Sequence, residues 1–103
     1  MTEAELFSIL TSFDDNIPVF YDHAVEKYPA PFLVYRSEQD DIFYADDIAY
    51  YAQNTFEVNL VTVLKDVTLE TAFESMLDSN FIAYTKSEYF DDVERVYIIT
   101  YNI

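Results

Sequence analysis

The chain has 103 residues, of which 20 are acidic and 5 are basic, and its formal net charge at pH 7 is -15. This excess of carboxylates argues against tight nucleic-acid binding and against docking on anionic membranes, because both depend on clustered lysine and arginine. Cysteine and glycine are absent, which excludes thiol nucleophiles, thiolate metal sites and glycine-rich nucleotide loops.

Hydrophobic residues make up 51% of the chain, which favours a folded structure over disorder. The length is near the commonest domain size, so we expect one domain spanning residues 1–103. No apolar run is long enough for a membrane span, and the N-terminus lacks a basic region followed by an apolar stretch. We therefore expect neither a transmembrane helix nor a signal peptide.

The first predicted element is an amphipathic helix over residues 3–13. Thr2 and Glu5 have the spacing of a capping box, and the apolar residues that follow recur at i, i+3, i+4 and i+7. These apolar residues are Leu6, Ile9, Leu10 and Phe13. Residues 14–16 should end the helix, residues 18–22 should form an edge strand or extended arm, and residues 27–31, with two prolines, should form a loop.

Two strands are predicted next, over residues 32–39 and 54–64. In the longer one Phe56, Val58 and Leu60 alternate with polar residues, so they should point to a core from a central strand. Between the two strands, residues 42–44 and 48–51 flank an aspartate pair and could form a small hairpin.

The second predicted helix follows Thr68, which is a plausible N-cap. Its apolar residues match helical spacing: Leu69, Ala72, Phe73, Met76 and Leu77. Asn80 should end it in the left-handed conformation. Residues 82–90 and 93–103 then predict an antiparallel hairpin, and the last strand is apolar on both faces, which predicts burial on both sides.

Together these elements predict an α+β fold, in which two helices pack on one face of a mainly antiparallel sheet. The expected order is α-β-β-(β)-β-α-β-β.

The sequence offers little for catalysis or metal binding. His23 is the sole histidine, so a histidine pair for a metal cannot form within one chain, and no serine has the setting of a nucleophile elbow. Adjacent aspartates occur at 14–15, 40–41, 46–47 and 91–92, and we interpret them as solvated turns rather than calcium ligands. We expect no enzyme, no cofactor and no metal site.

Tyrosine and phenylalanine are unusually abundant, with 10 and 9 residues. A domain of this size rarely buries so many completely, and exposed tyrosine is typical of protein interfaces. Tyr44, Tyr50, Tyr51 and Phe43 could instead stack on bases or sugars, but stacking surfaces for nucleic acid carry basic grooves, and here the neighbours are aspartates. The residues alone thus predict an acidic, non-enzymatic α+β domain that assembles with something.

Several segments distributed over nearly the whole chain resemble one family. They are residues 29–35 (PAPFLVY), 43–50 (FYADDIAY), 56–60 (FEVNL), Lys65-Asp66 with Glu70 and Glu74, and 94–97 (ERVY). In these segments the chain resembles small phage and prophage proteins of Gram-positive hosts that are encoded near the head-tail genes. Those proteins look like tail-terminator or tail-completion proteins of long-tailed phages. Relatives tend to have Ala-Asp-Asn where this chain has Ala45-Asp46-Asp47.

The resemblance implies a subunit of a ring, commonly a hexamer, that caps the tail tube and joins it to the head. Its partners would be further copies of itself, the tail-tube protein and the head connector. It would lie in the host cytoplasm during assembly and then at the head-tail junction of the virion. The interface we expect is an assembly arm, with residues Phe43, Tyr44, Asp46, Asp47, Tyr50 and Tyr51. Strong negative charge suits a pore that passes DNA without binding it.

Two alternatives remain at this stage. A head-side connector or stopper subunit belongs to the same class of assembly proteins. An acidic inhibitor that mimics DNA and occupies the basic groove of a host nuclease belongs to another class, but mimicry would need carboxylates spaced along one face, whereas here they lie mostly as doublets at turns.

Overall fold

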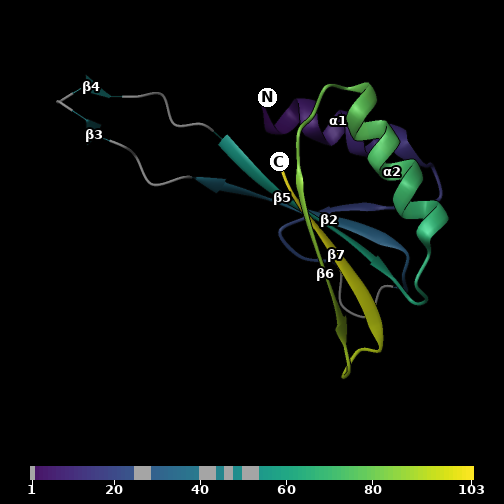
Figure 1. Ribbon diagram of the computed structural model, residues 1–103. Helices are drawn as coiled ribbons and strands as arrows, with labels where there is room; N and C mark the ends of the chain where they lie inside the picture. Colours follow the sequence, from purple (N-terminus) through teal and green to yellow (C-terminus); the bar gives the residue numbers. More distant parts are fainter. Residues whose placement is uncertain (1, 25–28, 40–43, 46–47, 50–53) are drawn as a thin grey trace.

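The computed structural model describes residues 2–24, 29–39, 44–45, 48–49 and 54–103. It has two helices and a five-stranded mixed sheet, which confirms the α+β class, and a separate two-stranded sheet (Figure 1). In chain order the elements are α1 (Glu3–Phe13), β1 (Val19–Tyr21), β2 (Phe32–Gln39), β3 (Tyr44–Ala45), β4 (Ile48–Ala49), β5 (Asn54–Thr62), α2 (Val67–Ser79), β6 (Thr85–Asp91) and β7 (Val96–Asn102).

The five-stranded sheet has the order β1-β2-β5-β7-β6. The prediction of a long central strand is confirmed, because β5 has nine residues and lies in the middle of the sheet. Every neighbouring pair is antiparallel except β1 and β2, which run parallel with Phe20 opposite Val34. The predicted edge strand at residues 18–22 is therefore present as β1, in a direction that the sequence does not specify.

Helix α1 has the bounds and the cap that the sequence predicts. The Thr2 hydroxyl accepts a hydrogen bond from the Glu5 amide at 3.1 Å, and the Glu5 carboxylate accepts one from the Thr2 amide at 3.4 Å. This reciprocal pairing satisfies two backbone donors that a helix start otherwise leaves free. The helix then buries Leu6 and Leu10 against the sheet.

Helix α2 begins two residues earlier than we predicted. Its N-cap is Asp66, not Thr68, because the Asp66 carboxylate accepts from the Leu69 amide at 3.0 Å. A carboxylate in this position also interacts favourably with the positive end of the helix dipole.

The end of α2 corrects a second prediction. Asn80 has φ -96° and is not left-handed; Phe81 takes that conformation, with φ 58°. The Asn80 side chain donates to the Met76 carbonyl at 2.8 Å, which holds Asn80 near the helix and moves the reversal of the chain to Phe81.

The core lies between the two helices and one face of the sheet. It comprises the fully or nearly fully buried apolar residues Leu6, Leu10, Ile17, Leu33, Tyr35, Phe56, Val58, Leu60, Phe73, Leu77, Ile99 and Tyr101. Both helices cover the same face (Figure 1). The alternation in β5 and the helical spacing in α2 therefore predicted the inward-facing residues correctly.

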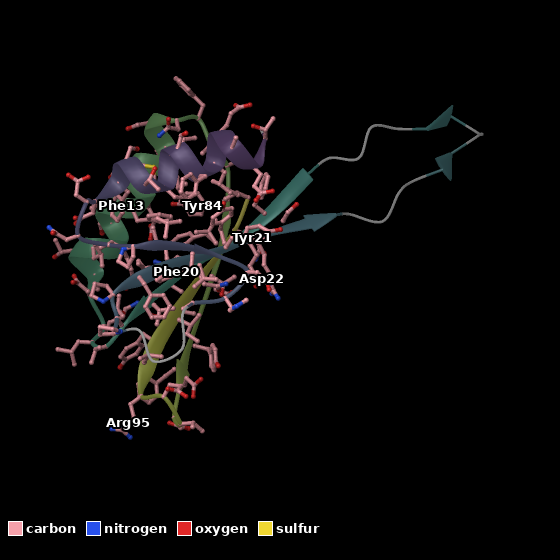
Figure 2. The ribbon with its side chains drawn as sticks, turned by 180° about the vertical axis from the view of Figure 1, so that it is seen from behind. Phe13, Phe20, Tyr21, Asp22, Tyr84 and Arg95 are labelled. Carbon is pink, nitrogen blue, oxygen red and sulfur yellow. The ribbon has the colours of Figure 1, made fainter. Side chains whose placement is uncertain are left out.

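The last two strands are shorter than predicted, and β7 is not buried on both sides. Ile99 and Tyr101 are buried under α2, whereas Val96 and Ile98 point to the other face and are only partly buried. Arg95, with φ 60°, belongs to the turn between β6 and β7, and Figure 2 shows it at the outer end of that hairpin. The turn starts at Asp91, whose carboxylate accepts from the Val93 amide at 2.9 Å.

Replacing Leu60 by alanine tests this account of the core. Leu60 is completely buried in β5, whereas Leu64, four residues later, is 76% exposed. We expect Leu60→Ala to lower the free energy of unfolding by about 2–5 kcal/mol, since it removes buried methyl groups and leaves a cavity. The matched Leu64→Ala change should alter it by less than about 0.5 kcal/mol. Urea denaturation followed by circular dichroism measures both, and equal effects would contradict the assignment.

Candidate functional site

Strands β2 and β5 extend beyond the strands that flank them. They pair over eight positions, from Phe32 opposite Val61 to Gln39 opposite Asn54. Strand β1 pairs with β2 only as far as Tyr35, and on the other side the pairing of β5 ends with two backbone hydrogen bonds between Phe56 and Ile103. In Figure 1 the paired ends of β2 and β5 point away from the rest of the sheet, on the side opposite to the β6–β7 turn. We call this extension, residues 37–39 and 54–55, the ribbon.

An ion pair joins the two strands at the base of the ribbon. Arg36 on β2 lies opposite Glu57 on β5, and its Nε donates to the Glu57 carboxylate at 3.0 Å. Opposite charges in this arrangement stabilise an antiparallel pair by a few tenths of a kcal/mol to about 1 kcal/mol. Backbone groups along the outer edges of such a two-stranded segment can pair with a strand of another molecule.

The predicted assembly arm follows the ribbon in the chain. Tyr44 lies in β3, which pairs with β4 through Tyr44 opposite Ala49 and Ala45 opposite Ile48. This agrees with the predicted hairpin around the aspartate pair. The other residues of the predicted interface lie outside the described residues, namely Phe43, Asp46, Asp47, Tyr50 and Tyr51.

His23, the sole histidine of the chain, follows β1. Its side chain is 83% exposed, and its Nδ1 lies 3.2 Å from the carboxylate of the adjacent Asp22. In the described part of the chain, no group of three or more His, Cys, Asp or Glu side chains could hold a metal ion. Neither described helix has the length and apolar character needed to cross a membrane.

Two of the aspartate doublets do lie in turns, as predicted. The Asp14 carboxylate accepts from the Asn16 amide at 2.8 Å where α1 ends, and Asp91 closes the β6–β7 turn. The doublets at 40–41 and 46–47 lie outside the described residues.

A network of charged side chains joins α2 to β6 and to the β5–α2 connection. Glu70 on α2 is 2% exposed, and Oε1 of its carboxylate lies 3.0 Å from Lys65 Nζ and 2.9 Å from Lys86 Nζ. Its Oε2 lies 2.9 Å from Lys65 Nζ but lacks hydrogen-bond geometry, so that contact is electrostatic. Lys65 also contacts Glu88 on β6.

Glu74, one helical turn after Glu70, extends this network into the core. Its Oε2 accepts from Lys86 Nζ at 2.8 Å and from the Tyr101 hydroxyl at 2.8 Å. Tyr101 is completely buried, so the carboxylate satisfies a hydroxyl that would otherwise be costly to bury. We call the residues Lys65, Glu70, Glu74, Lys86, Glu88 and Tyr101 the carboxylate–lysine network.

The network shifts the pKa values of its members. Burial raises the pKa of Glu70, but the ammonium groups of Lys65 and Lys86 outweigh burial and hold it below the usual 4.5. Burial likewise raises the pKa of Glu74, and Lys86 together with the Tyr101 hydroxyl lowers it below 4.5. Hydrogen bonds to Glu74 and Glu70 raise the pKa of Lys86, and burial, followed by the bond to Glu74, raises that of Tyr101.

Sequence reasoning missed this network. The helical spacing of α2 placed Glu70 outside the apolar stripe, although Glu70 is almost as buried as Phe73. The sequence signal for this network was a pair of lysines in a strongly acidic chain. Lys65 precedes α2, and Lys86 lies in the strand that follows it. Their partners could be assigned only once β6 was known to lie beside α2.

Comparison with protein-family models finds no match to this chain, and neither curated proteins nor solved structures match it.

Acid should weaken the fold through the carboxylate–lysine network. The folded-state pKa of Glu70 and of Glu74 lies below the usual 4.5, so their stabilising contribution is complete above about pH 5 and is lost as the pH falls through the folded-state pKa. Glu70→Gln should lower the free energy of unfolding at pH 7 by about 1–3 kcal/mol.

That deficit of Glu70→Gln relative to the wild type should be smaller at pH 3 than at pH 7, because below the usual pKa of 4.5 the unfolded wild-type chain binds a proton at Glu70 that the folded chain resists. Urea titrations at both pH values measure the difference. Asp92→Asn, in the exposed β6–β7 turn, serves as the control. An equal deficit for Glu70→Gln at both pH values would contradict the role assigned to Glu70.

Proposed function

We propose that this chain is a structural subunit of phage assembly, a tail-terminator or tail-completion protein that forms a ring, caps the tail tube and joins it to the head. The observation that carries the proposal is the ribbon. The buried core ends before it, since Tyr35 and Phe56 are the last core residues on β2 and β5. A paired extension beyond these residues is well suited to reach a neighbouring subunit.

Ring symmetry supports the same conclusion. A closed ring is built from heterologous contacts, in which one surface of a subunit meets a different surface of the next. The ribbon projects on the side of the sheet opposite to the β6–β7 turn (Figure 1), so each subunit offers different structures at its two ends. Specificity in such a ring comes from the fit of surfaces, and no bond has to be made or broken.

The charge also fits a channel for DNA. With 20 acidic and 5 basic residues, a ring of such subunits repels phosphates, so a passing duplex is not held at the wall.

The proposal is tested first on the wild-type protein. Native mass spectrometry and light scattering, with and without the tail-tube protein encoded by the same genome, should detect a ring of one defined size. A chain that stays monomeric at high concentration, both alone and with purified tail-tube protein, would contradict the proposal.

Removing the arm tests which part of the subunit makes the contact. A variant in which residues 40–53 are replaced by Asn-Gly should keep its fold, because a two-residue turn of this kind closes an antiparallel hairpin and the core residues are untouched. We expect its melting temperature to change by less than about 4 °C, equivalent to roughly 1 kcal/mol, while the ring is lost. A variant that still assembles would show that the contact lies elsewhere.

A double substitution tests whether Tyr50 and Tyr51 form the contact between subunits. Tyr50→Ser with Tyr51→Ser should weaken ring formation by about tenfold or more in the concentration required, as expected for aromatic anchors of an interface. Tyr89→Ser is the matched control, since Tyr89 is 56% exposed on β6. Light scattering across a dilution series compares the three proteins, and equal behaviour would exclude the two tyrosines from the contact.

A further inference from the structure

The two edges of the five-stranded sheet differ in length and regularity. Strand β1 has three residues, and Pro18, which lacks a backbone donor, directly precedes it. Short edge strands and proline both hinder the addition of a further strand. Strand β6 forms the opposite edge, and its seven residues pair with β7 at every position from Thr85 to Asp91. The β6 edge is therefore the longer and more regular template for strand addition.

The β6 edge is open to solvent. Six of its seven residues are exposed, and only Asp91, where the strand ends, is partly buried. Apart from its pairing with β7, β6 makes one backbone hydrogen bond among the described residues, in which the Asp91 carbonyl accepts from the Arg95 amide at 2.7 Å. The backbone groups on the outer side of β6 are thus available to a strand of another molecule.

The charged side chains within β6 lie on one face of the sheet. Lys86 and Glu88 lie on the face that the helices cover, since their partners on β7 are the buried Tyr101 and Ile99. On that face the carboxylate–lysine network holds both of them, and their side chains are still 35% and 37% exposed. The neighbours on the other face are uncharged, namely Thr85, Ser87 and Tyr89.

The sequence of β6 is complementary to itself in one antiparallel register. A two-fold axis perpendicular to the sheet places the helices of both copies on the same side, so residues of the same face meet. With Ser87 on the axis, Lys86 of each copy lies opposite Glu88 of the other, and opposite charges in this position stabilise the pair. With Lys86 or Glu88 on the axis, like charges face each other and destabilise it. Charge therefore selects the register centred on Ser87.

We propose that β6 pairs with β6 of a second copy in this register, which joins the two sheets into one continuous sheet. The inference goes beyond the proposed ring, because a two-fold contact closes on itself and cannot build a ring. It also leaves the ribbon free, since β7 separates β6 from β5 in the sheet. One subunit can therefore make both contacts.

Disulfide crosslinking tests the register, because the chain has no cysteine of its own. Ser87→Cys places one thiol on the proposed axis, where the two Cα atoms would lie about 4.5–5.5 Å apart, within the range of a disulfide. Thr85→Cys is the matched control on the same strand and face, since the two copies of residue 85 would lie about 13 Å apart. After mild oxidation of the full-length proteins, non-reducing electrophoresis should show at least about fivefold more crosslinked dimer for Ser87→Cys.

Two substitutions that change the net charge equally separate the register from overall repulsion. Glu88→Lys places a lysine opposite Lys86 of the second copy, so it should raise the Kd of the dimer by at least about threefold. Asp92→Lys, in the β6–β7 turn beyond the paired segment, should leave the Kd unchanged or lower it, since it reduces the repulsion between two chains of charge -15. Sedimentation equilibrium of the cysteine-free proteins measures the Kd, and circular dichroism checks that each variant is folded.

Three results would overturn the proposal. They are equal crosslinking at positions 87 and 85, no crosslinked dimer at position 87, and equal effects of Glu88→Lys and Asp92→Lys. Native mass spectrometry of the same proteins separates a dimer from a ring. A ring that forms without a crosslink at position 87 would exclude the β6 contact alone, whereas a crosslinked dimer that forms no ring with the tail-tube protein would count against the proposed function alone.

Discussion

The packing of three side chains from the middle strand supports every other part of the molecule. Phe56, Val58 and Leu60 of β5 are 2% exposed or less, and the strand that carries them is hydrogen-bonded on both sides. Helices α1 and α2 bury their apolar stripes against the face of the sheet that this strand centres. The same strand continues into the ribbon, so a core strand that is hydrogen-bonded on both sides also anchors the segment that we propose makes the subunit contact. A force that acts on the ribbon is therefore transmitted along β5 to the core of the subunit.

Elements with a clear period could be predicted from the sequence. The spacing of Leu6, Ile9, Leu10 and Phe13 predicts the bounds of α1, and alternation in residues 56–60 identifies the buried face of β5. Two failures were local, since Asp66 rather than Thr68 caps α2 and Phe81 rather than Asn80 is left-handed. The others depended on contacts between distant segments. The parallel direction of β1, the burial of Glu70 beside Lys86, and the points at which β1 and β7 stop pairing are set by how strands come together. The local sequence pattern carries none of that information, which is why the ribbon could be located only in the folded chain.

The lysines show how a very acidic chain uses few cations. Lys65 and Lys86 each bind two carboxylates and hold α2 to the last hairpin, where they also allow Glu74 to satisfy the buried Tyr101 hydroxyl. Carboxylates of the same subunit therefore neutralise the positive charge of both lysines. The chain keeps a net charge of -15, so the field around it is negative, and this disfavours the binding of nucleic acid.

The absence of glycine has its own consequence at three turns. Asp22, Phe81 and Arg95 have positive φ values of 69°, 58° and 60°, a conformation that costs a residue with a Cβ atom about 1–2 kcal/mol relative to glycine, somewhat less for aspartate. Domains of this size are stable by only about 5–15 kcal/mol, so the three turns together consume a sizeable share of that margin. For protein engineering, these turns are therefore where a more heat-resistant version of the chain would begin, since glycine there would relieve backbone strain while leaving the core and the ribbon unchanged.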